Sequence, residues 1–504
     1  MSSVERIRFV LDGEIVELDR VDPARTVLQY LREDRGRCGS KEGCAEGDCG
    51  ACTVVLVEAA ASGDSLQVRA VNACIQFLAT LDGKELITVE SLSGRGAALH
   101  PVQQAMVNEH GSQCGFCTPG FVMSLFALYK TRQAPSRVDI DDALAGNLCR
   151  CTGYRPIVAA AERMYELADD ANAGDWLAAA AGSELGVAER CAVLRSLEHD
   201  NDIELGDNGR CFHAPSSVDS LTALLSEYPD ATLLAGGTDV GLWVTKQYRD
   251  LNPVIYLGRI RELATVEVTR DGIDIGAAAT LTEVVPVLLE YYPQLKELFL
   301  RWASPPIRNA ATLVGNVANG SPIGDSMPAL MAAGTQVVLC SAAGRRSVPM
   351  EAFYLGYQKK DLRPGEFVER VLVSLPAPDT VLKSYKVSKR FDQDITAVCL
   401  GAHVRFDGDR ICDVRLAYGG MAATVARASG AEAVLEGQVL DEALIDVAMN
   451  AVGEDFTPLS DMRASADYRR AISRNLLRRL FLELRAERQG KPASSSVYAY
   501  GRAS

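Results

Sequence analysis

The chain has 504 residues, of which 48% are hydrophobic and 23% are charged, and its net charge is −14. This length exceeds one compact core and predicts three or four domains of about 150 residues each. The acidic balance argues against nucleic acid as the main partner, because phosphate binding calls for a basic surface. Neither a signal peptide nor a membrane-spanning apolar run is visible, so we expect a cytoplasmic protein without a membrane segment.

The first 170 residues are predicted to form two small domains. In residues 1–90, apolar positions alternate over 7–18 around Asp12-Gly13, a favoured hairpin turn. A helix with Val27, Leu28 and Leu31 on one face follows, and strands are expected at 53–57, 66–71 and 86–89. This pattern predicts an α+β domain. Residues 91–170 form an all-α domain, with apolar helices expected at 120–129 and 157–167.

The remaining chain is predicted to hold two further α+β domains. Residues 171–205 are rich in Ala, Gly, Asp and Glu without a clear period, which indicates a linker that is at most partly helical. Strands and helices alternate in 206–382. A last domain, 383–490, has expected strands at 397–406 and 413–418 and a helix at 468–487. Residues 491–504 are small and polar, which is typical of a flexible tail or an arm on a partner.

Nine of the 14 cysteines lie between residues 38 and 151. Clustered thiols in a cytoplasmic chain favour metal ligation over disulfides. Four of them, Cys44, Cys49, Cys52 and Cys74, have the C-x4-C-x2-C spacing with a distant fourth cysteine that is typical of a plant-type [2Fe–2S] site. Gly43, Gly47 and Gly50 would let the loop curl around a metal centre. A zinc site is the alternative, although zinc motifs usually pair cysteines as C-x2-C twice.

Four more cysteines form a C-x2-C pair, Cys114 and Cys117, and a C-x-C pair, Cys149 and Cys151. Each pair precedes an expected helix, with Thr118 as a candidate N-cap and Pro119 as the first helical residue. Two helix N-termini would then favour an anionic cluster. Zinc is a fairer alternative here on spacing alone, but a neighbouring cluster makes an electron-transfer pair the better interpretation. Cys38 fits neither set and is predicted to be a loop thiol.

Two loops are candidates for a dinucleotide site. Residues 233–241 read LLAGGTDVG, follow an expected strand and open a helix. They lack the G-x-G-x-x-G order but can hold a pyrophosphate through backbone amides. Residues 312–325 read TLVGNVANGSPIGD, and Asp325 could accept a hydrogen bond from a sugar hydroxyl. Either loop alone is equally well explained as a simple turn, whereas both together, after two metal sites, favour a flavin dinucleotide.

These motifs resemble the xanthine dehydrogenase group of molybdenum hydroxylases. The resemblance is carried by GCAEGDCGAC at 43–52, QCGFCTPG at 113–120 and NLCRCTGYRP at 147–156, together with both loops, and covers about residues 5–490. It implies a β-grasp ferredoxin-like [2Fe–2S] domain, a helical [2Fe–2S] domain, a vanillyl-alcohol-oxidase-type FAD domain and a C-terminal α+β cap domain of the carbon monoxide dehydrogenase flavoprotein kind.

The resemblance also implies roles for single residues. Those expected to hold FAD are Leu234, Ala235, Gly236, Gly237, Thr238, Asp239, Val240, Gly241, Thr312, Gly315, Asn316, Asn319, Ile323, Asp325 and Lys386. Tyr357 falls at a position near the nicotinamide nucleotide, and Gln113 at one that contacts molybdopterin. Animal relatives carry an aromatic residue after an Arg-Trp pair, whereas here Arg301-Trp302 is followed by Ala303, so the electron-acceptor pocket is expected to differ.

The implied activity is electron transfer rather than acid–base catalysis, and no catalytic residue is expected in this chain. The large molybdenum-binding domain of the family is absent, so a separate molybdenum subunit is expected as partner, in an (αβ)2 heterotetramer or a larger assembly. Electrons from the oxidation of hypoxanthine or xanthine to urate would pass through both clusters and FAD to NAD+. The alternatives are a molybdenum hydroxylase acting on an aldehyde or N-heterocycle with oxygen or a quinone as acceptor, and a non-enzymatic zinc-and-thiol scaffold.

Overall fold

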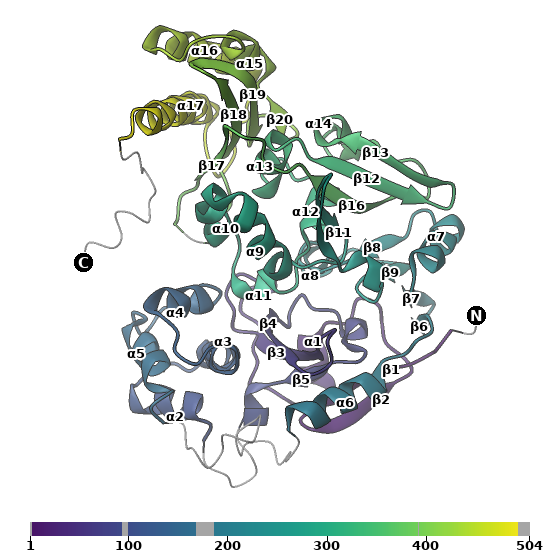
Figure 1. Cartoon of the computed structure of the whole chain (residues 1–504). Coiled ribbons are helices and arrows are strands. Elements are labelled where there is room, and N and C mark those ends of the chain that lie inside the picture. The colour runs from purple at the N-terminus through teal and green to yellow at the C-terminus, as the bar shows by residue number, and fades with distance from the viewer. Residues whose placement is uncertain (1–2, 93–98, 168–185, 392, 492–504) are drawn as a thin grey trace. The chain divides into compact units, whose positions relative to one another are not determined.

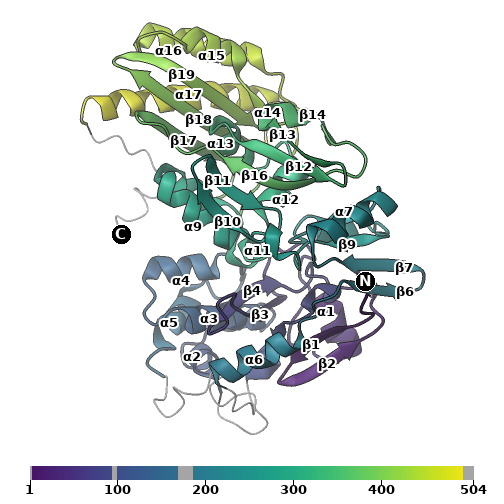
Figure 2. The same cartoon turned by 45° about the vertical axis from the view of Figure 1, so that its right-hand side comes forward.

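A computed structural model describes residues 3–92, 99–167, 186–391 and 393–491. The chain divides into two compact units, one of residues 1–261 with 304–311 and the other of residues 262–303 with 312–504. The segment 206–382, predicted as one FAD domain, therefore contributes to both units. Figures 1 and 2 show the elements of each unit from two sides.

The first unit begins with a five-stranded sheet in the order β2-β1-β5-β3-β4. Its strands are β1 (Ile7–Leu11), β2 (Glu14–Leu18), β3 (Thr53–Ala59), β4 (Leu66–Asn72) and β5 (Glu85–Ile87). The β1–β2 hairpin turns at Asp12 and Gly13, both with positive φ, as a two-residue turn of this type requires. The predicted helix begins as α1 (Val27–Gln29) and continues as a π-helical turn at Tyr30–Asp34. The two segments together bury the predicted face of Val27, Leu28 and Leu31. The predicted α+β domain is thus a β-grasp-like sheet that packs one helix.

Four helices follow the sheet: α2 (Pro101–Asn108), α3 (Thr118–Thr131), α4 (Arg137–Leu144) and α5 (Arg155–Arg163). The helix α3 is nearly all apolar and contacts β3 and β4, so its residues share a hydrophobic core with the sheet. Val102, Ala105 and Met106 are buried together on α2. This part confirms an all-α arrangement after the first sheet.

A further helix, α6 (Val187–Leu197), lies within the predicted linker 171–205. It contacts β1 and β3, and its Arg190 forms a buried ion pair with Glu85 of β5. Residues 168–185 of the linker lie outside the described residues, as do residues 492–504 of the predicted tail. The described end of the predicted linker is therefore part of the folded first unit.

The first unit ends with a four-stranded sheet in the order β6-β7-β9-β8. Its strands are β6 (Ile203–Asp207), β7 (Arg210–Ala214), β8 (Thr232–Leu234) and β9 (Val254–Tyr256), and β7, β9 and β8 run parallel. Between them lie α7 (Val218–Glu227) and α8 (Val240–Thr245), and the short α11 (Pro305–Arg308) belongs to the same unit. The strand, turn and helix expected around the loop 233–241 are thus β8, a glycine turn and α8.

The second unit holds a five-stranded antiparallel sheet in the order β10-β11-β16-β12-β13. Its strands are β10 (Val266–Thr269), β11 (Gly272–Gly276), β12 (Gln336–Ser341), β13 (Gly344–Pro349) and β16 (Phe367–Val373). The helices of this part are α9 (Leu281–Tyr291), α10 (Lys296–Arg301), α12 (Leu313–Asn319), α13 (Ser326–Ala332) and α14 (Met350–Phe353). A small hairpin of β14 (Tyr354–Gly356) and β15 (Lys359–Lys360) follows α14.

A second sheet of this unit, β17-β18-β19-β20, corresponds to the predicted last domain. Its strands are β17 (Thr380–Val387), β18 (Val398–Asp407), β19 (Arg410–Gly419) and β20 (Ala426–Arg427). The helices α15 (Ser429–Leu435), α16 (Glu442–Asp455) and α17 (Ala466–Arg488) pack with one face of the sheet around a common apolar core (Figure 2). Among the described residues, the helices are too short or too polar to cross a membrane.

The buried His403 on β18 gives this part of the second unit an expected pH dependence. Burial and the neighbouring Arg415 lower its pKa to about 4, against the opposing effect of Asp413, whose carboxylate lies 3.0 Å from Nε2. Because the unfolded imidazole titrates near 6.5, the unfolded chain binds more protons between about pH 6.5 and 4, and stability is lost as the pH falls through that window. At pH 5 we expect a loss of about 2 kcal/mol relative to pH 7.

This loss is measured as the free energy of unfolding in denaturant at pH 7 and pH 5, followed by a probe in the second unit. His403→Gln keeps a polar group beside Asp413 but does not titrate, so it should flatten the dependence. An equal loss in the variant would contradict the assignment to His403.

Candidate metal centres and dinucleotide loops

The first tetrad consists of Cys44, Cys49, Cys52 and Cys74, and the fold gathers its sulfurs at one place. The first three lie on the loop before β3, and Cys74 follows β4. Ala45, Gly47 and Gly50 have positive φ angles, which make this loop curl. Cys52 Sγ lies 3.2 Å from Cys74 Sγ, and the Cys44 sulfur accepts hydrogen bonds from both Cys49 and Cys74. The Cys49 amide also donates to Cys44 Sγ over 3.3 Å. The predicted ligand spacing therefore corresponds to four thiols linked in a row by the contacts Cys49–Cys44, Cys44–Cys74 and Cys74–Cys52.

The first tetrad favours negative charge at its centre. Hydrogen bonding with Cys49 and Cys74 lowers the pKa of Cys44, and the hydrogen bond that joins Cys52 and Cys74 lowers the pKa of Cys52 against the opposing effect of burial. The same shared protons raise the pKa values of Cys49 and Cys74. A cation that binds thiolates would displace these protons. The donor set therefore fits a thiolate-ligated metal centre.

The second tetrad consists of Cys114, Cys117, Cys149 and Cys151, in two contacting pairs. Cys114 pairs with Cys151, and Cys117 pairs with Cys149. The Cys149 sulfur accepts from the Thr152 hydroxyl at 3.2 Å and from the amides of Cys151 and Thr152 at 3.4 and 3.5 Å. Burial raises the pKa of Cys149, but these donors outweigh it and the net shift is downward. Burial and its contact with Cys149 raise the pKa of Cys117 to about 12.

No three His, Cys, Asp or Glu side chains in the described parts of the chain are grouped as ligands of one metal ion. A structural zinc ion would need four such side chains around one point. A [2Fe–2S] cluster shares four thiolates between two irons. The contacting pairs Cys114–Cys151 and Cys117–Cys149 supply the thiols for such sharing.

Helices begin directly after both parts of the second tetrad, as predicted, but the expected cap is wrong. Cys117 itself is the N-cap of α3, and Thr118 is the first helical residue, whose hydroxyl donates to Ser112. Pro119 is therefore the second helical residue. Proline is tolerated there because a backbone N–H at this position would have no acceptor within the helix. The helix α5 begins after Tyr154, whose hydroxyl accepts from the Cys149 amide.

The two tetrads lie in the same unit and are joined through the main chain. The amide of Leu148, which precedes Cys149, donates to the carbonyl oxygen of Cys49 over 3.0 Å. Cys52 and Cys74 of the first tetrad are buried, whereas Cys114 and Cys151 of the second tetrad are exposed. Cys38 is exposed as well and belongs to neither tetrad.

The glycine loop 234–241 connects β8 to α8 in the first unit. A Cβ atom at Gly236 would lie 1.9 Å from the Ala310 carbonyl oxygen, so glycine is required there by the close approach of the chain itself. Gly237 has a φ of +72°, which favours glycine in the turn. Asp239 is the N-cap residue of α8, and its carboxylate accepts from the Trp243 indole N–H at 3.0 Å. The loop is thus a strand-to-helix turn, as its sequence predicts.

The asparagine loop 312–325 belongs to the second unit. Thr312 caps α12 by accepting from the Gly315 amide, and Asn316 Oδ1 accepts from the Ser326 hydroxyl at 2.6 Å. At the end of the loop, the Asp325 carboxylate accepts from Lys386 Nζ at 2.6 Å and from the Thr396 hydroxyl. Two residues that were each predicted to contact FAD thus form a buried ion pair with each other.

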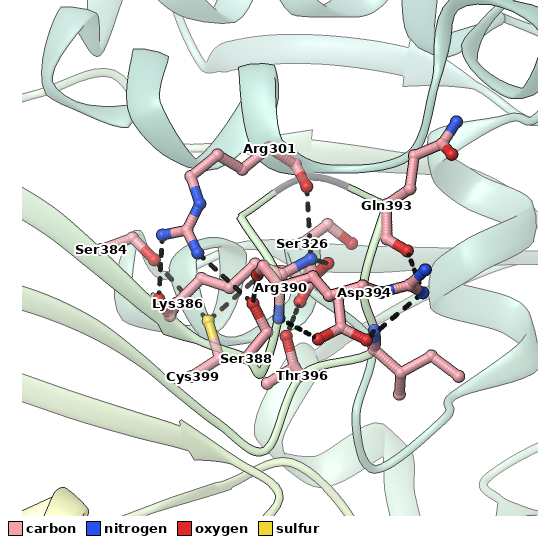
Figure 3. A network of polar contacts seen from close by, with 12 residues as sticks. Arg301, Ser326, Ser384, Lys386, Ser388, Arg390, Gln393, Asp394, Thr396 and Cys399 are labelled. Carbon is pink, nitrogen blue, oxygen red and sulfur yellow. Dashed lines mark hydrogen bonds and ion pairs between the residues drawn. The ribbon is translucent and has the colours of Figure 1, made fainter. Parts of the chain in front are cut away.

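Arg301 completes the buried network around Lys386 (Figure 3). Its guanidinium donates to the carbonyl oxygens of Lys386 and Phe391 at 3.0 and 3.1 Å, and its own carbonyl accepts from Lys386 Nζ at 3.3 Å. The sequence singled out Arg301 only for the residue that follows it, and gave no sign of Thr396. Their partners lie far away in sequence, which no local pattern reveals.

The two remaining candidates lie apart from these groups. Gln113 is exposed on the segment between α2 and α3, next to Cys114 of the second tetrad. Tyr357 lies at the turn of the β14–β15 hairpin and is 66% exposed. An apolar pocket of about 420 Å³ lies beside the Cys114–Cys117 segment and is lined by Met106, Val107, Pro119 and Val122 among others.

Four family models match the chain in sequence order. A 2Fe-2S iron–sulfur cluster binding domain matches residues 9–78, and a [2Fe-2S] binding domain matches 88–162. An FAD binding domain in molybdopterin dehydrogenase matches 205–378, and a carbon monoxide dehydrogenase flavoprotein C-terminal domain matches 383–484. These matches confirm the predicted fold classes of all four domains.

The chain is similar to curated xanthine dehydrogenases but spans about 40% of their length. It is 34% identical to xanthine dehydrogenase/oxidase of Gallus gallus, over 95% of this chain and 40% of the relative. It is 32% identical to xanthine dehydrogenase of Emericella nidulans, over 98% of this chain and 40% of the relative.

Solved structures resemble part of the chain. A chain of carbon monoxide dehydrogenase from Hydrogenophaga pseudoflava has a TM-score of 0.51 and 29% identity, over 53% of this chain and 94% of that chain. Quinoline 2-oxidoreductase from Pseudomonas putida 86 matches with a TM-score of 0.50 and 25% identity, over 54% of this chain and 95% of that chain. About half of this chain therefore corresponds to nearly the whole of one chain in each of these two proteins.

Proposed function

Because its four domains and its relatives assign this chain to the molybdenum hydroxylase family, we propose that it carries electrons from a molybdenum site outside the chain, through two [2Fe–2S] clusters and FAD, to NAD+. The observation that carries this proposal is the gathering of eight cysteines into two tetrads, each with amide donors directed at sulfur. A [2Fe–2S] cluster, which carries one electron at a time, needs such thiolate ligands, and such donors set its potential.

In this proposal the first tetrad holds one cluster and the second tetrad holds the other. The clusters, when bound, would pass electrons one at a time, and FAD would exchange pairs with NAD+. The exposed cysteines of the second tetrad and the neighbouring Gln113 favour this side as the one that receives electrons from the molybdopterin of the partner. The hydrogen bond from Leu148 to Cys49 then links the second tetrad to the first, more buried one.

FAD is proposed to bind through the residues of the glycine loop 234–241 and of the asparagine loop 312–325 named above. The amides at the start of α8 suit a diphosphate. The buried Lys386 supplies a positive charge, and the carboxylate of Asp325, which holds it, retains lone pairs that could accept from a sugar hydroxyl. Tyr357, exposed on its hairpin, is proposed to contact the nicotinamide nucleotide.

The proposed substrate of the whole enzyme is hypoxanthine or xanthine, oxidised to urate in purine catabolism, because relatives that match nearly the whole of this chain are xanthine dehydrogenases. The proposed partner is a molybdenum-cofactor subunit in an (αβ)2 heterotetramer or a larger assembly. The similarity to quinoline 2-oxidoreductase keeps a second candidate, the equivalent subunit of a hydroxylase for an N-heterocycle or aldehyde with another acceptor.

The test is the metal and flavin content of the purified chain, isolated without air. We expect about four irons, about four acid-labile sulfides and one FAD per chain, with paramagnetic signals after reduction by NADH. A colourless, zinc-containing protein would contradict the proposal and support a thiol scaffold. Turnover by the heteromer, with xanthine or quinoline as substrate and NAD+ or oxygen as acceptor, distinguishes the two candidate functions.

A further inference from the structure

The side chain of Asn147 lies between the two cysteine tetrads. It is 3% exposed, and its Nδ2 donates to the Gly50 carbonyl at 3.0 Å and to Thr53 Oγ1 at 3.2 Å, on the loop of the first tetrad. Its Oδ1 accepts from Ser124 Oγ at 2.6 Å, on the helix α3 that begins after Cys117. A single amide therefore bonds to segments of both tetrads and uses both its donors and its acceptor.

The backbone segments around Asn147 lie in close contact with one another. A Cβ atom at Gly50 would lie 2.1 Å from the Gly146 carbonyl oxygen, and one at Gly120 would lie 2.0 Å from the Gly50 carbonyl oxygen. These two glycines allow the loop of the first tetrad to contact the start of α3 and the segment before Cys149. Asn147 joins the segments at this point of closest approach.

We propose that Asn147 is a positioning residue that fixes the distance and orientation between the two tetrads and thereby sets the rate of electron transfer between their clusters. The proposal rests on the proposed function, since it assumes that both tetrads hold clusters. The hydrogen bonds of Asn147 go to Gly50, Thr53 and Ser124 rather than to a sulfur atom, so its effect is on geometry and not on ligation. A satisfied buried polar network of this kind specifies one arrangement of the segments that it joins.

The variant Asn147→Leu tests this role in the full chain. The Gly50 carbonyl still accepts from the Thr53 amide and hydroxyl, so no acceptor is left unpaired on that side and folding should persist. A matched control is Asn309→Leu, which removes a comparable bond from a side-chain amide to a backbone carbonyl, that of Ala70 on β4, outside both cysteine loops.

The readouts are iron content, the reduction potential of each cluster, the magnetic coupling between the reduced clusters in paramagnetic resonance, and the rate at which an injected electron equilibrates between them. We expect full iron content, a changed coupling and a severalfold lower rate in Asn147→Leu, because the tunnelling rate falls exponentially as the distance between two electron carriers grows. Asn309→Leu should match the unsubstituted chain in all four.

The outcomes separate the two proposals. An unsubstituted chain without iron overturns the proposed function. If the unsubstituted chain holds iron but its two reduced clusters show no magnetic coupling, the positioning role alone is overturned. The same follows if Asn147→Leu leaves both the coupling and the electron-transfer rate unchanged. If Asn147→Leu does not fold, Ser124→Ala is judged by the same measurements, since it removes only the bond that orients the amide; an unchanged coupling there overturns the role.

Discussion

Replacing Cys149 by serine is expected to remove the cluster of the second tetrad and to halve the iron content, from about four to about two atoms per chain. The Cys149 sulfur is the acceptor for the Thr152 hydroxyl and for two amides, so this position combines a ligand with the donors that hold its negative charge. A serine oxygen is a much poorer ligand for iron than a thiolate. The loss should stop electron flow from the partner, while FAD and reduction of a dye by NADH persist.

The matched control for this variant is Cys38→Ser. Cys38 is an exposed thiol on the same unit, and its backbone carbonyl accepts from the Arg32 guanidinium. Iron content, the paramagnetic signal of the first tetrad and turnover by the heteromer should all remain at the unsubstituted level. Full iron content or undiminished substrate turnover in Cys149→Ser would refute the assignment of Cys149 as a ligand.

The tetrads were predictable from the sequence because cluster ligation imposes short, fixed spacings. Three ligands of the first tetrad lie within nine residues, and the second is made of two close pairs. The hairpin at Asp12-Gly13 and the strand–turn–helix at 232–245 were predictable for the same reason, since their signals are local. Each of these features depends on residues that are neighbours in the chain.

Features that depend on distant pairs were not predictable. The described end of the predicted linker, whose small and acidic residues show no clear period, forms a helix that is held by the buried pair of Arg190 with Glu85. The Thr118 cap was wrong because the helix begins one residue earlier than its apolar pattern indicates. Similarly, Asp325 and Lys386 were each predicted to contact FAD, but nothing in the sequence indicated that they contact each other.

That buried pair carries the second large expected effect. In Lys386→Met the Asp325 carboxylate, largely buried, keeps only the Thr396 hydroxyl of its two side-chain partners. Removing one member of a buried ion pair costs about 3–5 kcal/mol, because the remaining charge is desolvated without compensation. We therefore expect a loss of this size in the free energy of unfolding of the second unit, together with loss of bound FAD.

A double variant separates stability from flavin binding. Lys386→Met with Asp325→Asn has no buried charge at this place, so much of the lost stability should return, since removing both charges of a buried pair costs far less than removing one. If the lysine also serves the flavin, as proposed, the double variant should fold well and still lack FAD. A double variant that regains both its stability and its FAD would mean that the pair only supports the fold, because the charge of Lys386 would then contribute nothing to the cofactor.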